Sequence, residues 1–296
     1  MTAAAVNPAP HANPPPRSDR HAISPTLFRE DPLIYCEQGL GDSVMMMRFL
    51  PEVQRRSAAT ITLYIQPPLQ RLAKRVLAGT GIRVIADPES MPFDAACPLM
   101  SLPFVLGINS PAAFLGATPY LRADPLRVAM FRDRLAQYPG RKLGLVWQGN
   151  VAAKMNRLRT IQEADLLPLL SLDGWSAVSL QHGCKAPMIG GLPVIDVSES
   201  IQDFDDLAAL MEAVDTTVSL DTGPVHLAGS LGVPVHTLLP WIHDWRWGVD
   251  GDTTPWYAEM VLYRQTGDGA WASAIAKLAR RLQSLGATRT SNHAAP

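Results

Sequence analysis

Leu220-Asp221-Thr222-Gly223-Pro224-Val225-His226-Leu227-Ala228-Gly229 is a stretch in which a buried-type strand runs straight into a helix. Thr222 can cap this helix, and Pro224 near its first position fixes φ without removing a needed backbone donor. Gly223 lets the backbone approach a ligand. A strand that enters a helix through one tight turn is the unit of a parallel α/β sheet, so this stretch predicts the fold class.

Similar units surround this turn in two series. The first predicts strands at 33–36, 61–65 and 82–85 and helices at 43–53 and 67–77. The second predicts strands at 143–147, 175–180, 216–220 and 234–239 and helices at 203–214 and 223–231. Two such series predict an α/β protein with two doubly wound, Rossmann-like parallel-sheet domains. Their ligand site is expected in the cleft between them, beyond the carboxyl ends of the strands.

The predicted domain boundaries follow from composition. Residues 1–30 are rich in proline and alanine and predict a disordered tail, and 287–296 predict another. The linker Pro139-Gly140 divides an N-terminal domain at 31–139 from a C-terminal domain at 140–270. Residues 271–286 predict a helix that packs on the body and stops at Gly286.

Composition excludes several classes of protein. The 296 residues carry 26 basic and 27 acidic side chains, so no overall field draws the chain to nucleic acid or to an anionic membrane. No apolar run reaches the roughly 18 residues that a membrane span needs. Three widely spaced cysteines suggest reduced thiols. We expect a cytoplasmic protein with at most peripheral contact to the inner membrane.

The start of the predicted helix at Gly223 is the first candidate site. Backbone N–H groups at a helix start, which carries about half a positive charge, favour an anion such as a diphosphate. The alternative is structural, with Asp221 as a strand-end cap and His226 as a packed helix histidine.

The second candidate is Glu37-Gln38-Gly39-Leu40-Gly41-Asp42, at the end of the first predicted strand. Asp42 stands at a helix start, where the dipole and backbone donors stabilise its ionised form. In a cleft it could act as a general base, and otherwise it is an N-cap.

Two further stretches carry charged or aromatic residues. Lys154, Arg157 and Arg159 lie in the loop 148–160, either solvated or directed at a departing diphosphate, and Arg159 is the favoured cation. An aromatic-rich stretch follows the last predicted strand and either packs in the core or walls the cleft to stack a base or sugar. Its members are Trp241, Trp245, Trp247, Trp256, Tyr257 and Trp271.

Taken together, these motifs resemble glycosyltransferase family 9, the heptosyltransferase type, and most closely the glycosyltransferase region of bacterial proteins that also carry tetratricopeptide repeats. The resemblance covers about residues 33–285. The motifs are Glu37 to Asp42, Ser101-Leu102-Pro103, Val146-Trp147-Gln148-Gly149-Asn150, Ser179-Leu180-Gln181, Asp221 to Ala228, Asp244-Trp245-Arg246-Trp247 and Pro255-Trp256-Tyr257.

The resemblance implies a GT-B fold and an inverting glycosyltransferase that needs no metal or other cofactor. It would move a sugar from a nucleotide-sugar donor to a glycan, glycolipid or protein hydroxyl, in cell-envelope glycan synthesis. Asp42 matches the family's general base, and Arg159 is the second catalytic candidate. The donor-side candidates are Gln148, Gly149, Asn150, Lys154, Gln181, Asp221, Thr222, Gly223, Pro224 and His226. The acceptor-side or cleft candidates are Glu37, Gln38, Gly39, Gly41, Trp245 and Arg246.

The loop after Asn150 departs from the family pattern, with Met155-Asn156 where relatives carry Asn-Asp. This departure motivates an alternative, a degenerate nucleotide-sugar-binding module that acts as a partner or regulatory subunit. A sugar epimerase on the same architecture is a third reading. Transfer or hydrolysis of the donor separates an enzyme from a binding module.

Overall fold

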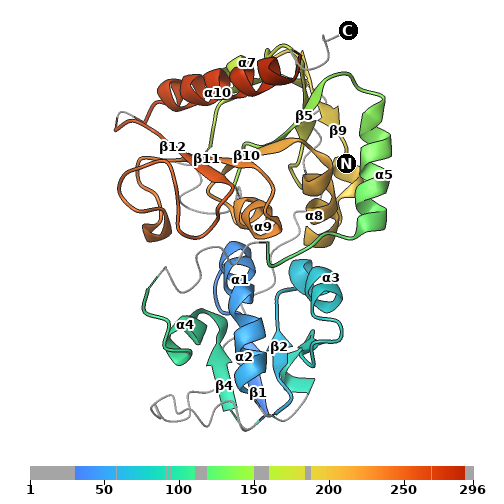
Figure 1. Cartoon of the computed structure of the whole chain (residues 1–296), viewed down its shortest axis with the longest axis vertical. Helices are drawn as coiled ribbons and strands as arrows, with labels where there is room; N and C mark the ends of the chain where they lie inside the picture. The colour runs from blue at the N-terminus through green and yellow to red at the C-terminus, as the bar shows by residue number, and fades with distance from the viewer. Residues whose placement is uncertain are drawn as a thin grey trace, which may run out of the picture.

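The computed structural model describes residues 31–57, 59–90, 93, 95–110, 119–149, 160–183, 188–267 and 269–290. They form two parallel sheets, one above the other along the long axis (Figure 1). The predicted tail at 1–30 and residues 291–296 lie outside the described residues.

The N-terminal sheet has the strand order β3-β2-β1-β4. All three of its pairings are parallel. Its strands are β1 (Pro32–Tyr35), β2 (Thr62–Tyr64), β3 (Arg83–Ile85) and β4 (Ala95–Pro98). Its helices are α1 (Leu40–Met46), α2 (Leu50–Arg56), α3 (Pro67–Val76) and α4 (Leu102–Val105).

The C-terminal sheet has the strand order β12-β11-β10-β5-β6-β9, also parallel throughout. The strands are β5 (Arg141–Val146), β6 (Trp175–Ser179), β9 (Ile195–Asp196), β10 (Thr216–Leu220), β11 (Val235–Leu239) and β12 (Met260–Arg264). A small hairpin joins β7 (Met188–Ile189) to β8 (Leu192–Pro193). The helices are α5 (Pro125–Ala136), α7 (Glu163–Leu170), α8 (Phe204–Ala213), α9 (Gly223–Leu231) and α10 (Ala272–Thr290).

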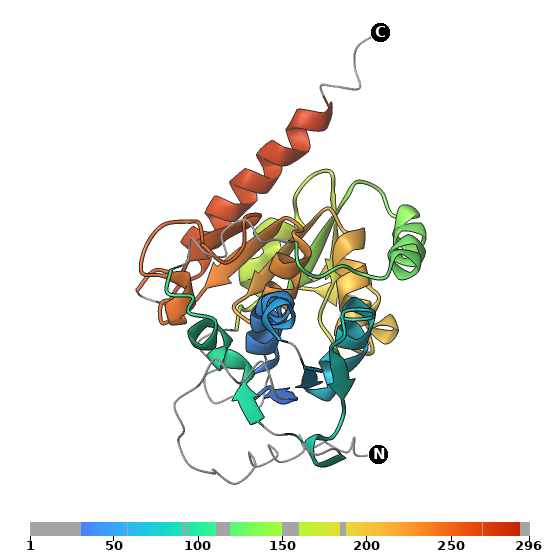
Figure 2. The same cartoon turned by 60° about the horizontal axis from the view of Figure 1, so that its bottom comes forward.

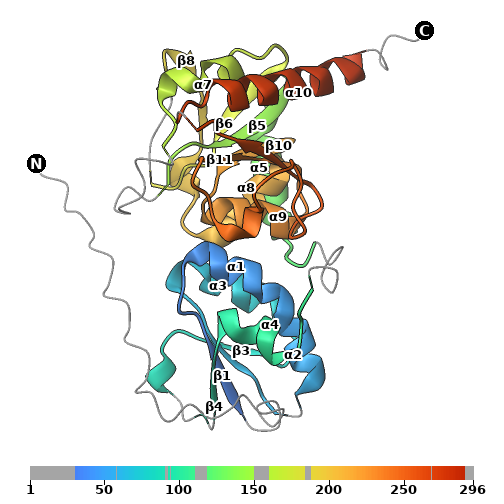
Figure 3. The same cartoon turned by 90° about the vertical axis from the view of Figure 1, so that its left-hand side faces the viewer.

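We call each sheet with its helices a body. The helices of the C-terminal body lie on both faces of its sheet. α7 and α10 pack together on the face away from the N-terminal sheet, and α8 and α9 lie on the face toward it (Figures 1 and 3). Buried apolar residues of α7 and α10 form a core of their own. A second, larger core runs from the N-terminal sheet into α8 and α9. The two sheets therefore share this larger core.

α5 lies against α8, within the C-terminal body (Figure 1). Asp124 caps it by accepting from the N–H of Leu126, and Pro125 occupies its first turn. The chain reaches the C-terminal body just before α5. There the N–H groups of Tyr120 and Leu121 both donate to the carbonyl of Ser230 in α9. The end of the predicted N-terminal segment 31–139 thus packs on the other body, and the boundary at Pro139-Gly140 stays a prediction.

The predicted helix at 43–53 is wrong in detail because it is two helices. α1 ends at Met46, a 3₁₀ turn covers Met47–Phe49, and α2 begins at Leu50. Pro51 has no N–H, and its ring would clash with the carbonyl four residues earlier, so one continuous α-helix cannot pass it.

The predicted stop at Gly286 is also wrong. α10 continues to Thr290 and projects beyond the sheet (Figure 2). Glycine inside a helix costs only about 1 kcal/mol relative to alanine, and the next proline in the chain is Pro296, beyond the last residue of α10. Ala287, placed in the predicted C-terminal tail, therefore belongs to the helix. Within the described residues, no helix is both long and apolar enough to cross a membrane.

A cluster of three arginines and three aspartates joins α3 to α8 and α5, and we call it the arginine–aspartate cluster. Arg71 Nη2 lies 2.6 Å from Asp203 Oδ1 and 2.6 Å from Asp206 Oδ2. Arg75 Nη2 lies 2.6 Å from Asp205 Oδ1, and Arg127 pairs with Asp206. This cluster is one of the polar contacts that hold the two bodies together.

Candidate functional site

The N-termini of α1 and α9 meet where the two bodies face each other (Figure 3). A Cβ added to Gly41 would lie 2.6 Å from His226 Cδ2 and 3.3 Å from Gly223 Cα. A Cβ on Gly223 would lie 3.1 Å from the ring of Phe204. Only glycine allows this approach at position 41, whereas a Cβ on Gly223 would meet Gly41 N at an ordinary 3.6 Å. We call this contact, with Asp42 and Arg246, the seam.

Asp42 lies at the seam in the first turn of α1, and both of its carboxylate oxygens are bonded. Oδ2 accepts from the Gly39 N–H at 3.1 Å, and Oδ1 accepts from Arg246 Nη2 at 2.7 Å. The Asp42 side chain remains 20% exposed. The predicted role as a helix-start residue is therefore correct, and one side of the carboxylate still faces solvent.

Arg246 is the centre of the seam. Its Nε donates to Asp244 Oδ1 at 2.9 Å, and its Nη1 lies 3.0 Å from His226 Nε2. Burial alone would lower the pKa of Arg246, but Asp42 and Asp244 outweigh that effect and raise it. The guanidinium is thus a permanent cation that joins α1 of one body to α9 of the other.

His226 is buried and neutral. Burial, then the charges of Arg246 and Arg48, hold its pKa well below the usual range. Because Arg246 can only donate, His226 Nε2 is the acceptor and Nδ1 carries the proton toward Tyr257 Oη, 2.9 Å away. The ring also stacks on Trp247, with centroids 5.4 Å apart. A histidine packed in this way contacts Arg246 rather than open solvent.

Arg48 is a second buried cation, which the sequence analysis missed. Its guanidinium lies over the rings of Tyr120, Trp256 and Tyr257, and its Nη2 donates to the Trp256 carbonyl at 2.9 Å. Cation–π contacts of this kind stabilise desolvated guanidinium groups. An arginine inside the apolar run Val44 to Leu50 was the available signal.

The donor-side candidates that the structure describes lie at the carboxyl ends of neighbouring strands. Gln148 and Gln181 bond reciprocally, the Gln148 N–H to Gln181 Oε1 and Gln181 Nε2 to the Gln148 carbonyl, both at 3.2 Å. Thr222 is the N-cap residue of α9, as predicted, but its side chain makes no capping hydrogen bond. Its hydroxyl instead donates to the Leu220 carbonyl at 3.2 Å.

Other predicted residues are placed as follows. Asp221 is buried at the end of β10, and Pro224 lies in the first turn of α9. Gln38 is exposed, and its carbonyl accepts from Gln66 Nε2. Burial raises the pKa of Glu37, and backbone hydrogen bonds from Met100 and Leu99 oppose the shift. Asn150, Lys154, Arg157 and Arg159, with the altered Met155-Asn156, lie outside the described residues.

The aromatic-rich stretch divides into two sets. Trp247, Trp256, Tyr257 and Trp271 are buried, as the packing reading predicts. Trp241 and Trp245 are 61% and 67% exposed. The packing reading therefore holds for the four buried members, and the cleft reading stays a prediction.

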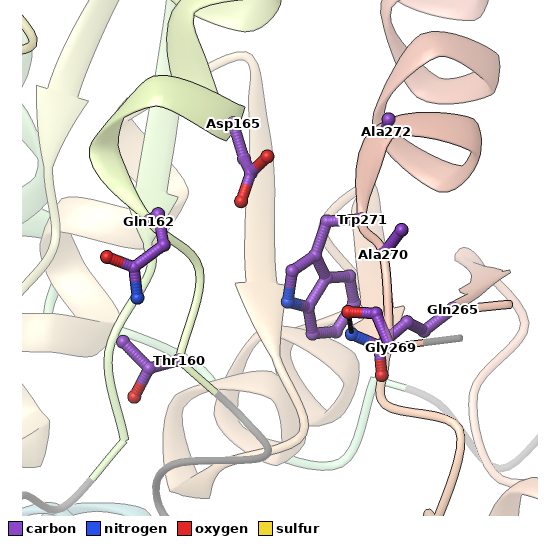
Figure 4. Close-up of a pocket in the computed structure, with 8 residues that line it drawn as sticks. All are labelled: Thr160, Gln162, Asp165, Gln265, Gly269, Ala270, Trp271 and Ala272. Carbon is purple, nitrogen blue, oxygen red and sulfur yellow. Dashed lines mark hydrogen bonds between the residues drawn. The ribbon is translucent and has the colours of Figure 1, made fainter. Parts of the chain in front are cut away.

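A cavity of about 310 Å³ opens between the first turns of α7 and α10 (Figure 4). Thr160, Gln162 and Asp165 line one side, and Gln265, Trp271 and the backbone of Gly269 line the other. Thr160, the last residue of the loop predicted to meet the donor, is part of this lining. In the described part of the chain, no cluster of histidine, cysteine and carboxylate side chains could hold a metal ion.

Two parallel sheets that face each other, with helices packed on them, are the arrangement of a GT-B fold. The model for glycosyltransferase family 9 (heptosyltransferase) matches residues 202–248, a segment that includes α8, α9 and Arg246. Solved structures share the fold. A family 9 glycosyl transferase from Veillonella parvula is 13% identical, with a TM-score of 0.55 over 84% of this chain and 91% of that one. E. coli ADP-heptose lps heptosyltransferase II is 12% identical, with a TM-score of 0.56 over 88% and 99%.

Protein FlbA of Caulobacter vibrioides is 28% identical over 285 residues, which are 86% of this chain and 47% of FlbA. The chain thus spans about half the length of this curated relative. These comparisons confirm the resemblance to family 9 and the GT-B fold that it implied.

Proposed function

We propose that the chain is an inverting glycosyltransferase that needs no metal. It moves a sugar from a nucleotide-sugar donor to a hydroxyl of a glycan, glycolipid or protein acceptor. The observation that carries the proposal is the seam, where Arg246 holds a carboxylate of the N-terminal body against a helix start of the C-terminal body. A transferase with one substrate on each body needs its base and its charge-stabilising groups at this meeting point.

In the proposed reaction Asp42 removes the proton of the acceptor hydroxyl. The oxygen then forms a bond to the anomeric carbon, and the bond from that carbon to the donor diphosphate breaks. The electron pair leaves with the diphosphate. General base catalysis of this kind contributes about 10²–10⁴-fold.

The departing diphosphate would lie against the start of α9. Thr222 and Gly223 present this helix end, and no side chain caps it. A helix start carries about half a positive charge, which stabilises the growing anion without a metal. Arg159 is proposed as the second cation. The other donor-side candidates are Gln148, Gly149, Asn150, Lys154, Gln181, Asp221 and Pro224.

Arg246 is proposed as a positioning residue. It keeps Asp42 oriented, and His226 in turn fixes Arg246, so His226 acts through Arg246 rather than by contact with the donor. The acceptor would enter over Glu37, Gln38, Gly39 and Trp245. For the chain we propose a cytoplasmic location, with at most peripheral contact to a membrane that carries the acceptor.

Thermal unfolding of the protein, measured without metal in the presence of UDP-, ADP-, GDP- or CMP-linked sugars, identifies the donor as the one that raises the melting temperature. A donor at about 100 times its dissociation constant stabilises the folded state by roughly 2.7 kcal/mol. Thr222→Trp, which fills the start of α9, should abolish this stabilisation. Stabilisation by none of the four nucleotide classes would contradict the proposal.

Asp42→Asn tests the base, with Asp244→Asn as the matched control. Both carboxylates bond Arg246, but only Asp42 is the proposed base. We expect Asp42→Asn to lower turnover by about 10²–10⁴-fold while donor affinity is kept, and Asp244→Asn to lower it far less. Equal losses in the two variants would show that Asp42 only anchors Arg246.

A further inference from the structure

Trp245 is an exposed aromatic side chain on a rigid turn. It begins the 3₁₀ turn Trp245–Trp247 and is 67% exposed, whereas Trp247 at the other end of the turn is 2% exposed. An indole that faces water on a fixed backbone offers a large apolar surface that loses little entropy on binding.

Several contacts fix the orientation of this turn. Asp244 accepts from the Arg246 N–H at its start, and Trp256 Nε1 donates to the Arg246 carbonyl at 3.1 Å. The Trp245 ring rests edge-on against Trp256, with centroids 6.0 Å apart and planes at 76°. Trp256 is itself buried. The Trp245 indole is therefore held by Trp256 at its edge, and most of its surface is exposed to solvent.

The exposed ring lies beside the proposed base. Arg246 Cζ is 5.9 Å from the Trp245 ring centroid, and Arg246 Nη2 is 2.7 Å from Asp42 Oδ1. One guanidinium group thus separates the ring from the carboxylate. A substrate whose hydroxyl reaches Asp42 can therefore place its neighbouring atoms over or beside the indole.

The charges around the ring select the kind of substrate. Asp42 and Asp244 keep side-chain exposures of 20% and 29%, so carboxylate oxygens border the indole and disfavour an anionic group. Asp250 and Asp252 follow on the same loop and disfavour an anionic lipid surface. A neutral sugar ring fits both features, since its C–H face packs on an indole and its hydroxyls donate to carboxylates.

We propose that Trp245 is the platform on which a neutral pyranose ring of a glycan acceptor stacks, next to the hydroxyl that Asp42 deprotonates. This inference rests on the proposed glycosyl transfer and names the acceptor class.

Binding is tested without turnover by the indole N–H resonances of ¹⁵N-labelled protein. The probes are methyl glycosides of glucose, galactose, mannose and N-acetylglucosamine, added at millimolar concentration. Trp245→Phe and Trp241→Phe assign the two exposed indoles by loss of their signals. At least one glycoside should shift the Trp245 signal and leave the Trp241 signal in place.

Trp241 is the matched control, because it is equally exposed on the same loop but makes no contact with Arg246 in the described structure. With a glycan acceptor, Trp245→Ala should raise the acceptor KM about 10-fold with kcat within about twofold. Trp245→Phe should restore most of the affinity, and Trp241→Ala should leave KM unchanged.

Equal shifts of both indoles, or none with any glycoside, would overturn the inference. So would a shift of Trp245 by a serine- and threonine-containing peptide alone, which would assign a protein acceptor. These readouts need neither donor nor turnover. A shifted Trp245 signal together with no transfer activity would therefore refute the proposed reaction and leave the ring-binding site standing.

Discussion

The seam brings the backbones of α1 and α9 close together at Gly41 and Gly223, whereas the arginine–aspartate cluster between α3 and α8 is built of long side chains. At the seam, a single methyl group on Gly41 would overlap the ring of His226. In the cluster, arginine side chains that are 27–37% exposed reach over Asp205 and Asp206, which are almost fully buried.

The two contacts differ in what they can tolerate. A contact made by backbone approach and a buried ring has one geometry, because neither can rotate away. Arginines on flexible stems can keep a carboxylate paired as the bodies shift by small amounts. The seam therefore defines one precise arrangement of the proposed site, and the cluster holds the bodies together around it.

Gly41→Ala should give the largest loss of stability, because it disrupts the close backbone contact at the seam. The new methyl group would lie 2.6 Å from His226 Cδ2, and that ring is held by Tyr257, Arg246 and Trp247. Overpacking typically costs 1–3 kcal/mol, and we expect about 3 kcal/mol in urea unfolding because the ring cannot move.

Gly267→Ala is the control for Gly41→Ala. Its Cβ would meet Trp241 at an ordinary distance of 3.5 Å, so its stability should change by less than about 0.5 kcal/mol. If Gly41→Ala were as stable as Gly267→Ala, the seam would be looser than its glycines imply.

Asp206→Ala tests the cluster and should cost about 2 kcal/mol. Asp206 accepts from Arg71, Arg127 and the Gln202 N–H, and its side chain is 1% exposed. Losing one partner of a buried pair costs about 3–5 kcal/mol, and we discount this because both arginines are about one-third exposed and can be hydrated.

Glu52→Ala is the matched control for the cluster. Glu52 also pairs with two arginines, Arg55 and Arg56, but within one helix, and its side chain is 30% exposed. Exposed pairs contribute about 0–1 kcal/mol, so urea unfolding should hardly change. Equal losses in Glu52→Ala and Asp206→Ala would mean that burial adds nothing to the cluster.

The sequence predicted best where structure is local. The turn from Leu220 into α9 was predicted from a few neighbouring residues, and β10 and α9 have the predicted bounds. The N-cap Asp124 with Pro125 gave an equally local signal for α5 that the sequence analysis did not use. Strand β12 is a short apolar run within the aromatic-rich stretch and was not separated from it.

The site could be predicted only in part, because its geometry is not local. Asp42 and Arg246 were both candidates, but they are 204 positions apart, and nothing in the spacing pairs them. The role of Arg48 also depends on rings more than 70 positions away in the chain. Such contacts depend on how the two bodies meet, which periodicity and turn signals do not encode.

Mild acid should weaken the seam but not the arginine–aspartate cluster, because the ionisable groups of the two contacts titrate in different pH ranges. The expected loss of stability is smaller than for the substitutions above. His226 keeps its pKa far below the usual value in the folded protein, while the unfolded chain binds its proton below about pH 6.5. The folded state therefore loses stability as pH falls below that value, by about 1.4 kcal/mol per pH unit. In the cluster, burial raises the pKa of Asp203, but Arg71 and the backbone N–H groups of Asp205 and Asp206 together outweigh burial and lower it overall. The contribution of Asp203 to the stability of the folded state is therefore present above about pH 3.9 and is lost only as pH falls further.

His226→Gln isolates this effect, because glutamine still offers Arg246 an acceptor but does not titrate. Between pH 7 and about 5.5 the wild type should lose about 1 kcal/mol more than the variant in urea unfolding. Burial also lowers the pKa of His236 to about 4, and that histidine is common to both proteins, so it cancels in the difference. Parallel pH profiles for the two proteins would mean that His226 takes up its proton as readily in the folded protein as in the unfolded chain. Its Nε2 would then not be kept as an acceptor for Arg246, and the path from His226 through Arg246 to Asp42 would have to be abandoned.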